Sequence, residues 1–406
     1  MRSTVVLTSL VLLAAACTSD NGIAEPTTTA SAESTTTTAP PPPDVDRLVI
    51  IDAQGRVVAM DRDGASPVVL SEMDDVPFQP AWSFDGSSIA YADRNPPSAF
   101  VVADAEGGSA AQRVDTMTPP FYFLWSPSGD EIGSLRNGST GIIFEITTIG
   151  DGIAMTERDR GQPFYYSWSP DGDRLVAHVG VDRLEVLELE GIDDPLIDDP
   201  GAFRAPQWSA SGVFAARSTP SGQQLLRIAE DGESEVLADL LGAVVFTASP
   251  DGQRVAVQSF VEGEGSVSAA LPQLSLPPNR LHVIDLETGE AEALTTEPAL
   301  AFFWSPDGSQ LLLLGPGGSA GETRWSVWDG ETITAGPAFR PGASWVAEFL
   351  PFFDQYAQGV SLWAPDSTAY AFPGAIGGVS GIWVAEPGGE DATKVADGTW
   401  VAWSHS

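Results

Sequence analysis

The side chains that most often carry acid–base or metal chemistry are scarce in this chain. Its 406 residues include three histidines, His178, His282 and His405. At least 104 residues separate any two of them, so no pair has the close spacing of a zinc-binding H-E-x-x-H helix. Because the residues around each histidine alternate between apolar and polar, we expect all three histidines to lie on β-strands.

Two short motifs suggest other chemistry but lack the context that it needs. Residues 317–321, G-G-S-A-G, match the G-x-S-x-G pattern around Ser319, yet that motif requires a helix after the turn and a strand is predicted there. Asp61 and Asp63 begin like a calcium loop, but residues 64–71 contain no further carboxylate. We therefore expect turns at both places and no catalytic residue. We also expect no cofactor, with calcium the one ion that the sequence suggests at all.

The single cysteine, Cys17, follows an N-terminal segment typical of an export signal. Arg2 supplies a positive charge, and the apolar run of residues 5–16 would be about 18 Å long as a helix, too short for a hydrocarbon core of about 30 Å. The small residues 14–16 before Cys17 resemble the lipobox of bacterial lipoproteins. This resemblance implies removal of residues 1–16, a diacylglycerol on Cys17 and attachment to the outer side of the cell membrane.

The composition divides the rest of the chain into a tether and a folded domain. Residues 17–44 are rich in Thr, Ser, Ala and Pro and contain almost nothing that could be buried, which predicts a disordered tether with a reach of about 80 Å. Residues 45–406 contain the alternating apolar pattern of a folded domain. We expect this domain to be a monomer.

The charge of the chain limits its partners. Nineteen Lys and Arg residues face 56 Asp and Glu residues, a formal net charge of −37 at pH 7. Phosphate backbones are bound by cationic side chains, so we expect no nucleic acid partner and no electrostatic docking on anionic lipid. Cations or basic partners fit the charge better, although acidity also simply keeps an exported protein soluble.

A repeated hairpin predicts the architecture of the folded domain. A W-S-P-D-G pattern or a degenerate form of it recurs at intervals of 43, 43, 40, 40, 56, 59 and 40 residues, a period typical of propeller blades. Pro, Asp and Gly each favour a tight turn between two strands. The first positions of the repeats are Trp82, Trp125, Trp168, Trp208, Ala248, Trp304, Trp363 and Trp403.

The two ends of the domain predict how the ring closes. Residues 47–71 contain three strands that lack the strand before the turn, and residues 399–406 contain that missing strand alone. We predict an all-β, eight-bladed β-propeller of four-stranded antiparallel blades, with the C-terminal strand completing the N-terminal blade. Seven blades are the alternative if the degenerate unit at Ala248 or Trp363 is an excursion.

The hairpins and the apolar strands after them resemble the TolB-type, WD-like β-propeller repeat across residues 47–406. The resemblance implies the fold and says little about function, because such propellers serve as scaffolds, as ligand binders and as parts of peptidases. We therefore expect a non-catalytic, envelope-anchored scaffold that binds a glycan, a peptide or another envelope protein. The alternative is a metal-assisted enzyme, such as a lactonase or a glycan lyase, that uses carboxylates at the channel mouth.

Two insertions interrupt the repeat, at residues 259–279 and 340–359. Both should emerge on the face opposite the W-S-P-D-G turns, because strands alternate in direction. The second insertion is unusually aromatic, and Pro-Phe pairs recur where three units begin. We predict an aromatic ligand surface on this face, or else a plug that folds inward and closes the channel. The candidate residues are Trp345, Phe349, Phe352, Phe353, Asp354, Tyr356, Phe78, Phe121 and Phe164.

Overall fold

The computed structural model describes residues 46–405 except 151, 190–193, 199–203 and 262–275. The predicted signal peptide and tether, with Cys17, lie outside the described residues, as does most of the insertion predicted at 259–279. In the described part of the chain, no helix is both long and apolar enough to cross a membrane.

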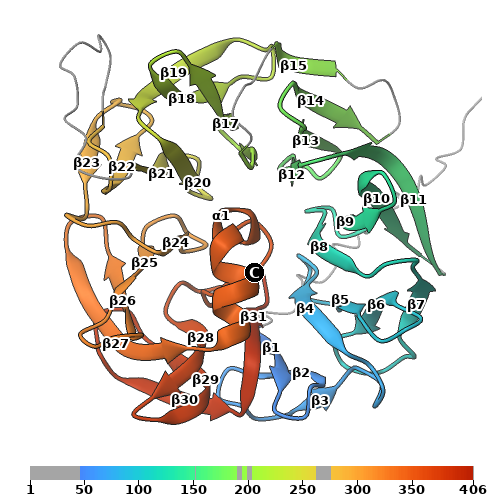
Figure 1. Ribbon diagram of the computed structural model, residues 1–406. Coiled ribbons are helices and arrows are strands. Elements are labelled where there is room, and N and C mark those ends of the chain that lie inside the picture. The colour runs from blue at the N-terminus through green and yellow to red at the C-terminus, as the bar shows by residue number, and fades with distance from the viewer. Residues whose placement is uncertain (1–45, 151, 190–193, 199–203, 262–275, 406) are drawn as a thin grey trace, which may run out of the picture. The chain divides into compact units, whose positions relative to one another are not determined.

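The described strands form seven antiparallel sheets arranged as a ring, a β-propeller (Figure 1). In five of these sheets, four strands follow one another in sequence order from the channel outward. These are β4 (Pro77–Trp82), β5 (Ser88–Asp93), β6 (Ala99–Asp104) and β7 (Gln112–Asp115); β8 (Pro120–Trp125), β9 (Glu131–Gly138), β10 (Gly141–Ile149) and β11 (Ile153–Gly161); β12 (Phe164–Trp168), β13 (Arg174–Val179), β14 (Arg183–Glu188) and β15 (Asp194–Asp198); β16 (Gln207–Ser209), β17 (Gly212–Thr219), β18 (Gly222–Ile228) and β19 (Ser234–Leu240); and β20 (Ala243–Ala248), β21 (Arg254–Phe260), β22 (Leu281–Asp285) and β23 (Ala291–Ala293).

The sheet that closes the ring joins the two ends of the domain, as predicted. Its strands are β31 (Gly398–Trp403), β1 (Arg47–Asp52), β2 (Val57–Asp61) and β3 (Val68–Val69). Leu48 pairs with Trp403 and Ile50 with Val401, so the C-terminal strand occupies the inner position that the N-terminal strands lack. This pairing leaves neither end of the chain as a free inner edge.

The last sheet has seven strands, because the predicted units that begin at Trp304 and Trp363 share it. It contains β24 (Ala301–Trp304), β25 (Leu311–Pro316), β26 (Thr323–Trp328), β27 (Ile333–Pro341), β28 (Tyr370–Ile376), β29 (Val379–Ala385) and β30 (Ala392–Ala396). Two residue pairs, Arg340 with Ala375 and Pro341 with Gly374, join β27 to β28. The inner strand expected around Trp363 is reduced to isolated bridges. The count of eight blades stays a prediction.

The W-S-P-D-G sequence builds both a turn and a connection between blades. In the hairpin β12–β13, Ser169 Oγ donates a hydrogen bond to Asp171 at 2.5 Å and accepts one from the Arg174 N–H at 3.0 Å. Gly172 has φ +81°, a conformation that glycine adopts without strain. The Trp168 indole donates to the Leu124 carbonyl in the preceding blade at 3.0 Å. Trp125, Trp304 and Trp363 make the same bond to the blade before them.

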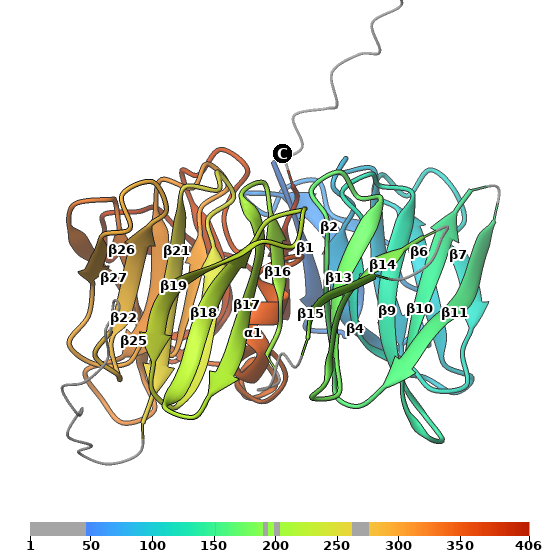
Figure 2. The ribbon, with the colours of Figure 1, turned by 90° about the horizontal axis from the view of Figure 1, so that it is seen from above.

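Strand direction gives the propeller two faces, which we name by what lies on them. The W-S-P-D-G turns and the C-terminal end of β31 lie on the turn face, at the top of Figure 2. The connections that follow the second and fourth strands of each unit lie on the opposite, plug face. The plug comprises η1 (Trp345–Phe349, a π-helix), η2 (Leu350–Phe352, a 3₁₀-helix) and α1 (Phe353–Tyr356). Figure 1 shows α1 in the centre of the ring.

Candidate functional site

The aromatic insertion folds inward and fills the channel. Trp345, Phe349, Phe353 and Tyr356 have exposed fractions of 2%, 0%, 5% and 5%. Phe349 stacks on Trp345 and on Tyr356, with ring centroids 5.3 and 5.1 Å apart. Phe352 is the exposed aromatic side chain of the segment, at 44%. The predicted aromatic residues therefore form a plug, the second of our two alternatives, and four of them cannot contact a ligand on the outer surface.

Hydrogen bonds from the inner strands hold the plug in place. Gln207 Nε2 donates to the Asp354 carbonyl at 3.2 Å, and Tyr122 Oη donates to the Gln355 carbonyl at 3.1 Å. Gln79, which has a positive φ of 51°, bonds through its amide to Tyr356 Oη. Such a φ is strained for a non-glycine residue. The plug is thus tied to at least three separate blades.

The three Pro-Phe phenylalanines lie at the plug-face ends of inner strands and are part of the core. Phe78 and Phe164 are buried, and Phe121 is half-buried. The Arg94 guanidinium lies 3.2 Å from the ring centroid of Phe78. Phe164 stacks on Phe144 at 5.2 Å. Phe78 and Phe164 are therefore packing residues and do not form an exposed recognition surface.

Asp354 is the one carboxylate of the predicted aromatic set, and it lies in α1 of the plug. Burial raises the pKa of Asp354 to about 6. A hydrogen bond from the Gln355 N–H to the carboxylate, 3.1 Å, opposes this shift. A nearby Arg204 charge opposes it further. The charged form of Asp354 is therefore less favourable in the folded protein than in water, and protonation removes this free-energy cost.

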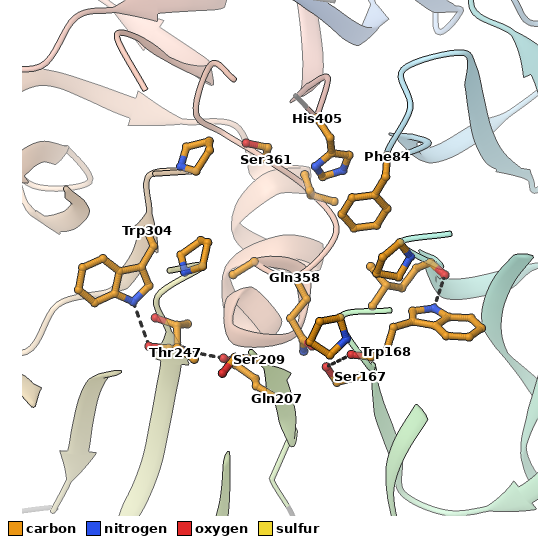
Figure 3. Close-up of a pocket in the computed structure, with 18 of the residues that line it drawn as sticks. Phe84, Ser167, Trp168, Gln207, Ser209, Thr247, Trp304, Gln358, Ser361 and His405 are labelled. Atoms are coloured by element: carbon orange, nitrogen blue, oxygen red, sulfur yellow. Dashed lines mark hydrogen bonds between the residues drawn. The ribbon is translucent and has the colours of Figure 1, made fainter. Parts of the chain in front are cut away.

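A funnel opens on the turn face, directly above the plug. Its volume is about 660 Å³, a usual size for a small-molecule site. The W-S-P-D-G turns of successive blades form its rim, and the segment after α1, including Gln358 and Val360, lines its floor. Figure 3 shows Trp168, Trp304 and Gln207 around it. The rim prolines are Pro127, Pro170, Pro250, Pro306 and Pro365.

The polar groups of the funnel are mainly amides and hydroxyls. Gln207 Oε1 accepts from the Ala248 N–H at 2.8 Å, and Ser167 Oγ accepts from the Trp208 N–H at 2.9 Å. Thr247 Oγ1 and Gln358 Nε2 are buried atoms that have no hydrogen-bond partner. A buried polar atom without a partner costs free energy that a ligand can recover by bonding to it.

Two titratable side chains lie among the funnel residues, and neither titrates near neutral pH. Burial alone would raise the pKa of Asp85, but hydrogen bonds from Ser83 and Ser87 hold the pKa of that carboxyl below its usual range. Burial lowers the pKa of His405 to about 4, opposed by a hydrogen bond with the Gly359 backbone. His405 stacks on Phe84, with centroids 4.3 Å apart and planes at 18°. Its ring is neutral above about pH 5.

The remaining sequence candidates lie apart from the funnel. Ser319 is exposed in the turn between β25 and β26, where we expected a turn. Asp61 and Asp63 flank the turn after β2, and Asp63 accepts a hydrogen bond from the Ala65 N–H. His178 and His282 are buried strand residues, as predicted, whereas His405 lies beyond the end of β31. Among the described residues, no three His, Cys, Asp or Glu side chains form a group that could hold a metal ion.

The comparisons with known proteins give the fold and no family. No protein-family model matches the chain, and the search of curated proteins finds no match. The fold resembles a solved eukaryotic initiation factor (12% identity, TM-score 0.53, 88% of this chain and 98% of that one). It also resembles oligogalacturonate lyase from Vibrio parahaemolyticus (14% identity, TM-score 0.50, 81% of this chain and 96% of that one). A further solved structure, TolB from Acinetobacter baumannii, has 13% identity and a TM-score of 0.41 over 86% of this chain and 79% of that one. Identities this low carry the β-propeller fold alone, which the sheet topology shows independently.

Sequence reasoning missed the funnel, because its residues come from all eight of the repeats. Each W-S-P-D-G turn has a local explanation as a turn, so no single copy marks a binding site. The predicted ring of blades was the one feature that could have indicated the funnel. In a propeller, equivalent turns must surround one end of the channel, and a plug that enters from the other end leaves a cavity that opens between those turns.

Proposed function

We propose that this protein is a non-catalytic ligand-binding propeller, held at the outer side of the cell membrane by a lipid on Cys17. It would bind the end of a neutral glycan in the turn-face funnel. The observation that carries this proposal is the funnel of about 660 Å³ that opens on the turn face. Its lining combines aromatic and proline rings with amides and hydroxyls.

The unpaired atoms of the funnel favour a glycan. Sugar hydroxyls both donate and accept, so one ligand could bond to Thr247 Oγ1 and accept from Gln358 Nε2. The apolar face of a sugar ring would pack on the rim prolines and on the Phe84–His405 pair. A charged sugar fits less well, because the ionised Asp85 would repel an anion. An uncharged peptide is the second candidate ligand.

The titration behaviour of the funnel favours binding over catalysis. General acid–base catalysis is most effective when the pKa of the group lies near the working pH. Asp85 and His405 both titrate well below neutrality, and Asp85 is hydrogen-bonded within its own turn. These groups support positioning of a ligand more than transfer of its protons.

A glycan and peptide array tests the ligand, using the full chain with Cys17→Ser so that it stays in solution. We expect binding to neutral glycans that Thr247→Val weakens about fivefold, the effect of losing one hydrogen bond. Ser319→Ala, far from the funnel, is the matched control and should bind normally. Binding to peptides alone would replace the glycan with the second candidate, and binding that Thr247→Val leaves unchanged would contradict the site.

The enzyme alternative and the anchor have their own tests. Incubating the same chain with array-positive glycans and Ca²⁺ or Mn²⁺ should leave the glycans intact. Metal-dependent release of shorter products would replace the binding proposal with the lyase or lactonase alternative. For the anchor, membrane fractionation should place the native chain in the membrane and the Cys17→Ser chain in the soluble fraction.

A further inference from the structure

The exposed apolar side chains of this protein gather on the plug face, opposite the funnel. Eleven large apolar side chains are exposed among the described residues. Nine of them lie in connections on this face, at strand ends on this face or in the plug. Single exposed apolar residues are ordinary, but their concentration on one face is not. The nine are Met73, Val76, Met117, Val181, Phe260, Leu300, Val346, Phe352 and Val379.

Four of these residues lie on segments that are joined by a backbone hydrogen bond and ion pairs, and we call them the apolar patch: Met73, Val76, Met117 and Val346. The Arg94 N–H donates to the Val76 carbonyl at 3.0 Å, and the Arg94 guanidinium pairs with Glu348, two residues after Val346, at 3.3 Å. On the other side, Arg113 pairs with Asp75, two residues after Met73, at 2.9 Å and lies four residues before Met117. The patch thus spans the first two inter-blade connections and the plug.

The two methionines are the most exposed members of the patch. Met73 is 94% exposed and Met117 is 91% exposed, so folding of this chain buries almost none of their surface. Methionine is flexible and polarisable and adapts to the shape of a partner, which is why it is common at binding surfaces.

Carboxylates without a cationic partner surround the patch. Glu72, Asp74 and Asp115 are exposed, and no ion pair to them is found among the described residues. The nearby arginines do not offset them, because Arg94 is paired with Glu348 and Arg113 with Asp75 and Asp93. The patch is therefore apolar with a net negative border.

We infer that the apolar patch is the docking surface for a protein segment that presents apolar side chains flanked by lysines or arginines. Apolar contacts would bury the methionines, and the basic flanks would meet Glu72, Asp74 and Asp115. Charge complementarity selects this occupant. A second copy of this chain would bring the same negative border, and an anionic bilayer would be repelled by it. The inference does not depend on the funnel, which lies on the opposite face.

A synthetic peptide provides a defined probe for the patch. The probe is a labelled Leu/Lys peptide of about five helical turns whose leucines lie on one side. Its control is an isomer with the same composition and the leucines spread evenly. Binding to the full chain with Cys17→Ser is followed by fluorescence anisotropy. We expect the amphipathic peptide to bind more tightly than the isomer, since both have the same charge.

Two sets of substitutions distinguish the patch from general attraction to an acidic protein. Changing Met73, Val76, Met117 and Val346 to serine should weaken binding by about tenfold or more. The control chain, Val69→Ser with Ile333→Ser, removes exposed apolar side chains elsewhere and should bind like the parent. A third chain carries Glu72→Gln, Asp74→Asn and Asp115→Asn. Its binding of the peptide should depend less on salt concentration than that of the parent chain.

Several results would overturn the inference. Equal binding of the patch variant and the control chain would assign the attraction to overall charge. Equal binding of the two peptides would do the same. Flotation with zwitterionic or anionic vesicles that the patch variant loses would assign the patch to a bilayer. Concentration-dependent dimers of the parent chain, abolished in the patch variant, would assign it to a second copy.

Discussion

Asp354 and His405 should give the stability of this protein two opposite pH dependences that nearly cancel. Asp354 lies in the plug and has a pKa of about 6 in the folded chain, against an ordinary value of 3.8. His405 lines the funnel above it and has a pKa of about 4, against 6.5. Each difference corresponds to about 3 kcal/mol of folding free energy.

The signs follow from which state binds the proton. Between pH 3.8 and about 6, folded Asp354 is protonated while the unfolded residue is not, so stability falls as the pH rises. Between about pH 4 and pH 6.5, unfolded His405 is protonated while the folded residue is not, so stability rises with pH. The two windows overlap, and the free energy of unfolding should change little across them from these two groups.

Single substitutions should reveal each half of this balance. Asp354→Asn keeps an oxygen for the Gln355 N–H and removes the charge. The variant should be more stable than the parent by up to about 3 kcal/mol near pH 7, and equal to it near pH 4. For His405→Gln, the stability relative to the parent should increase by up to about 3 kcal/mol as the pH falls from about 7 to about 4. Loss of the stack on Phe84 adds a pH-independent cost.

Urea unfolding at several pH values, followed by tryptophan fluorescence, measures both effects. The double variant is the internal control, because it should again change little with pH relative to the parent. If Asp354→Asn has the same stability difference from the parent at pH 4 and pH 7, the carboxylate is not held in a desolvated site and this argument fails.

Three further predictions concern the plug, the repeat and the ring. Phe349→Ala should lower the free energy of unfolding by about 3–5 kcal/mol, because Phe349 is fully buried, whereas Phe352→Ala should cost under about 1 kcal/mol in the same urea titration. Ser305→Ala removes a side chain that bonds to Asp307 and to the Gln310 N–H and should cost about 1–3 kcal/mol; Ser319→Ala should change nothing measurable. A chain that stops before β31 should lose cooperative thermal unfolding, because β1 loses its inner partner; an unchanged calorimetric transition would refute this.

The turns could be predicted because they depend on residues close in sequence. The ring closure could be predicted because it depends on the number of strands at each end of the domain. The W-S-P-D-G turn is specified by neighbours within five residues, as the Ser169 bonds to Asp171 and Arg174 show. Ring closure followed from counting strands at the two ends, and the pairing of β31 with β1 confirms it. Sharing of one sheet by β27 and β28 was not predicted, because two residue pairs at strand ends leave no pattern in the sequence.

The direction of the aromatic insertion could not be decided from the sequence. Trp345, Phe349 and Tyr356 would suit an exposed recognition surface as well as a plug, and the choice depends on the width of the channel and on the side chains that line it. Gln79, Tyr122 and Gln207 make that choice, because each bonds to the plug from a different inner strand. Their positions in the sequence give no indication that they converge.

The plug connects the two faces, and its stability comes from the channel rather than from its own helices. Isolated helices of three to five residues are unstable in water. The plug therefore keeps its form through aromatic contacts of Trp345 and Phe349 with Trp325, Phe303 and Trp400, and through bonds from the inner strands. Gln358, on the funnel floor, lies two residues after the end of α1. It follows that Phe349→Ala should weaken ligand binding in the funnel although Phe349 does not line it, and that saturating ligand should restore part of the lost stability by mass action.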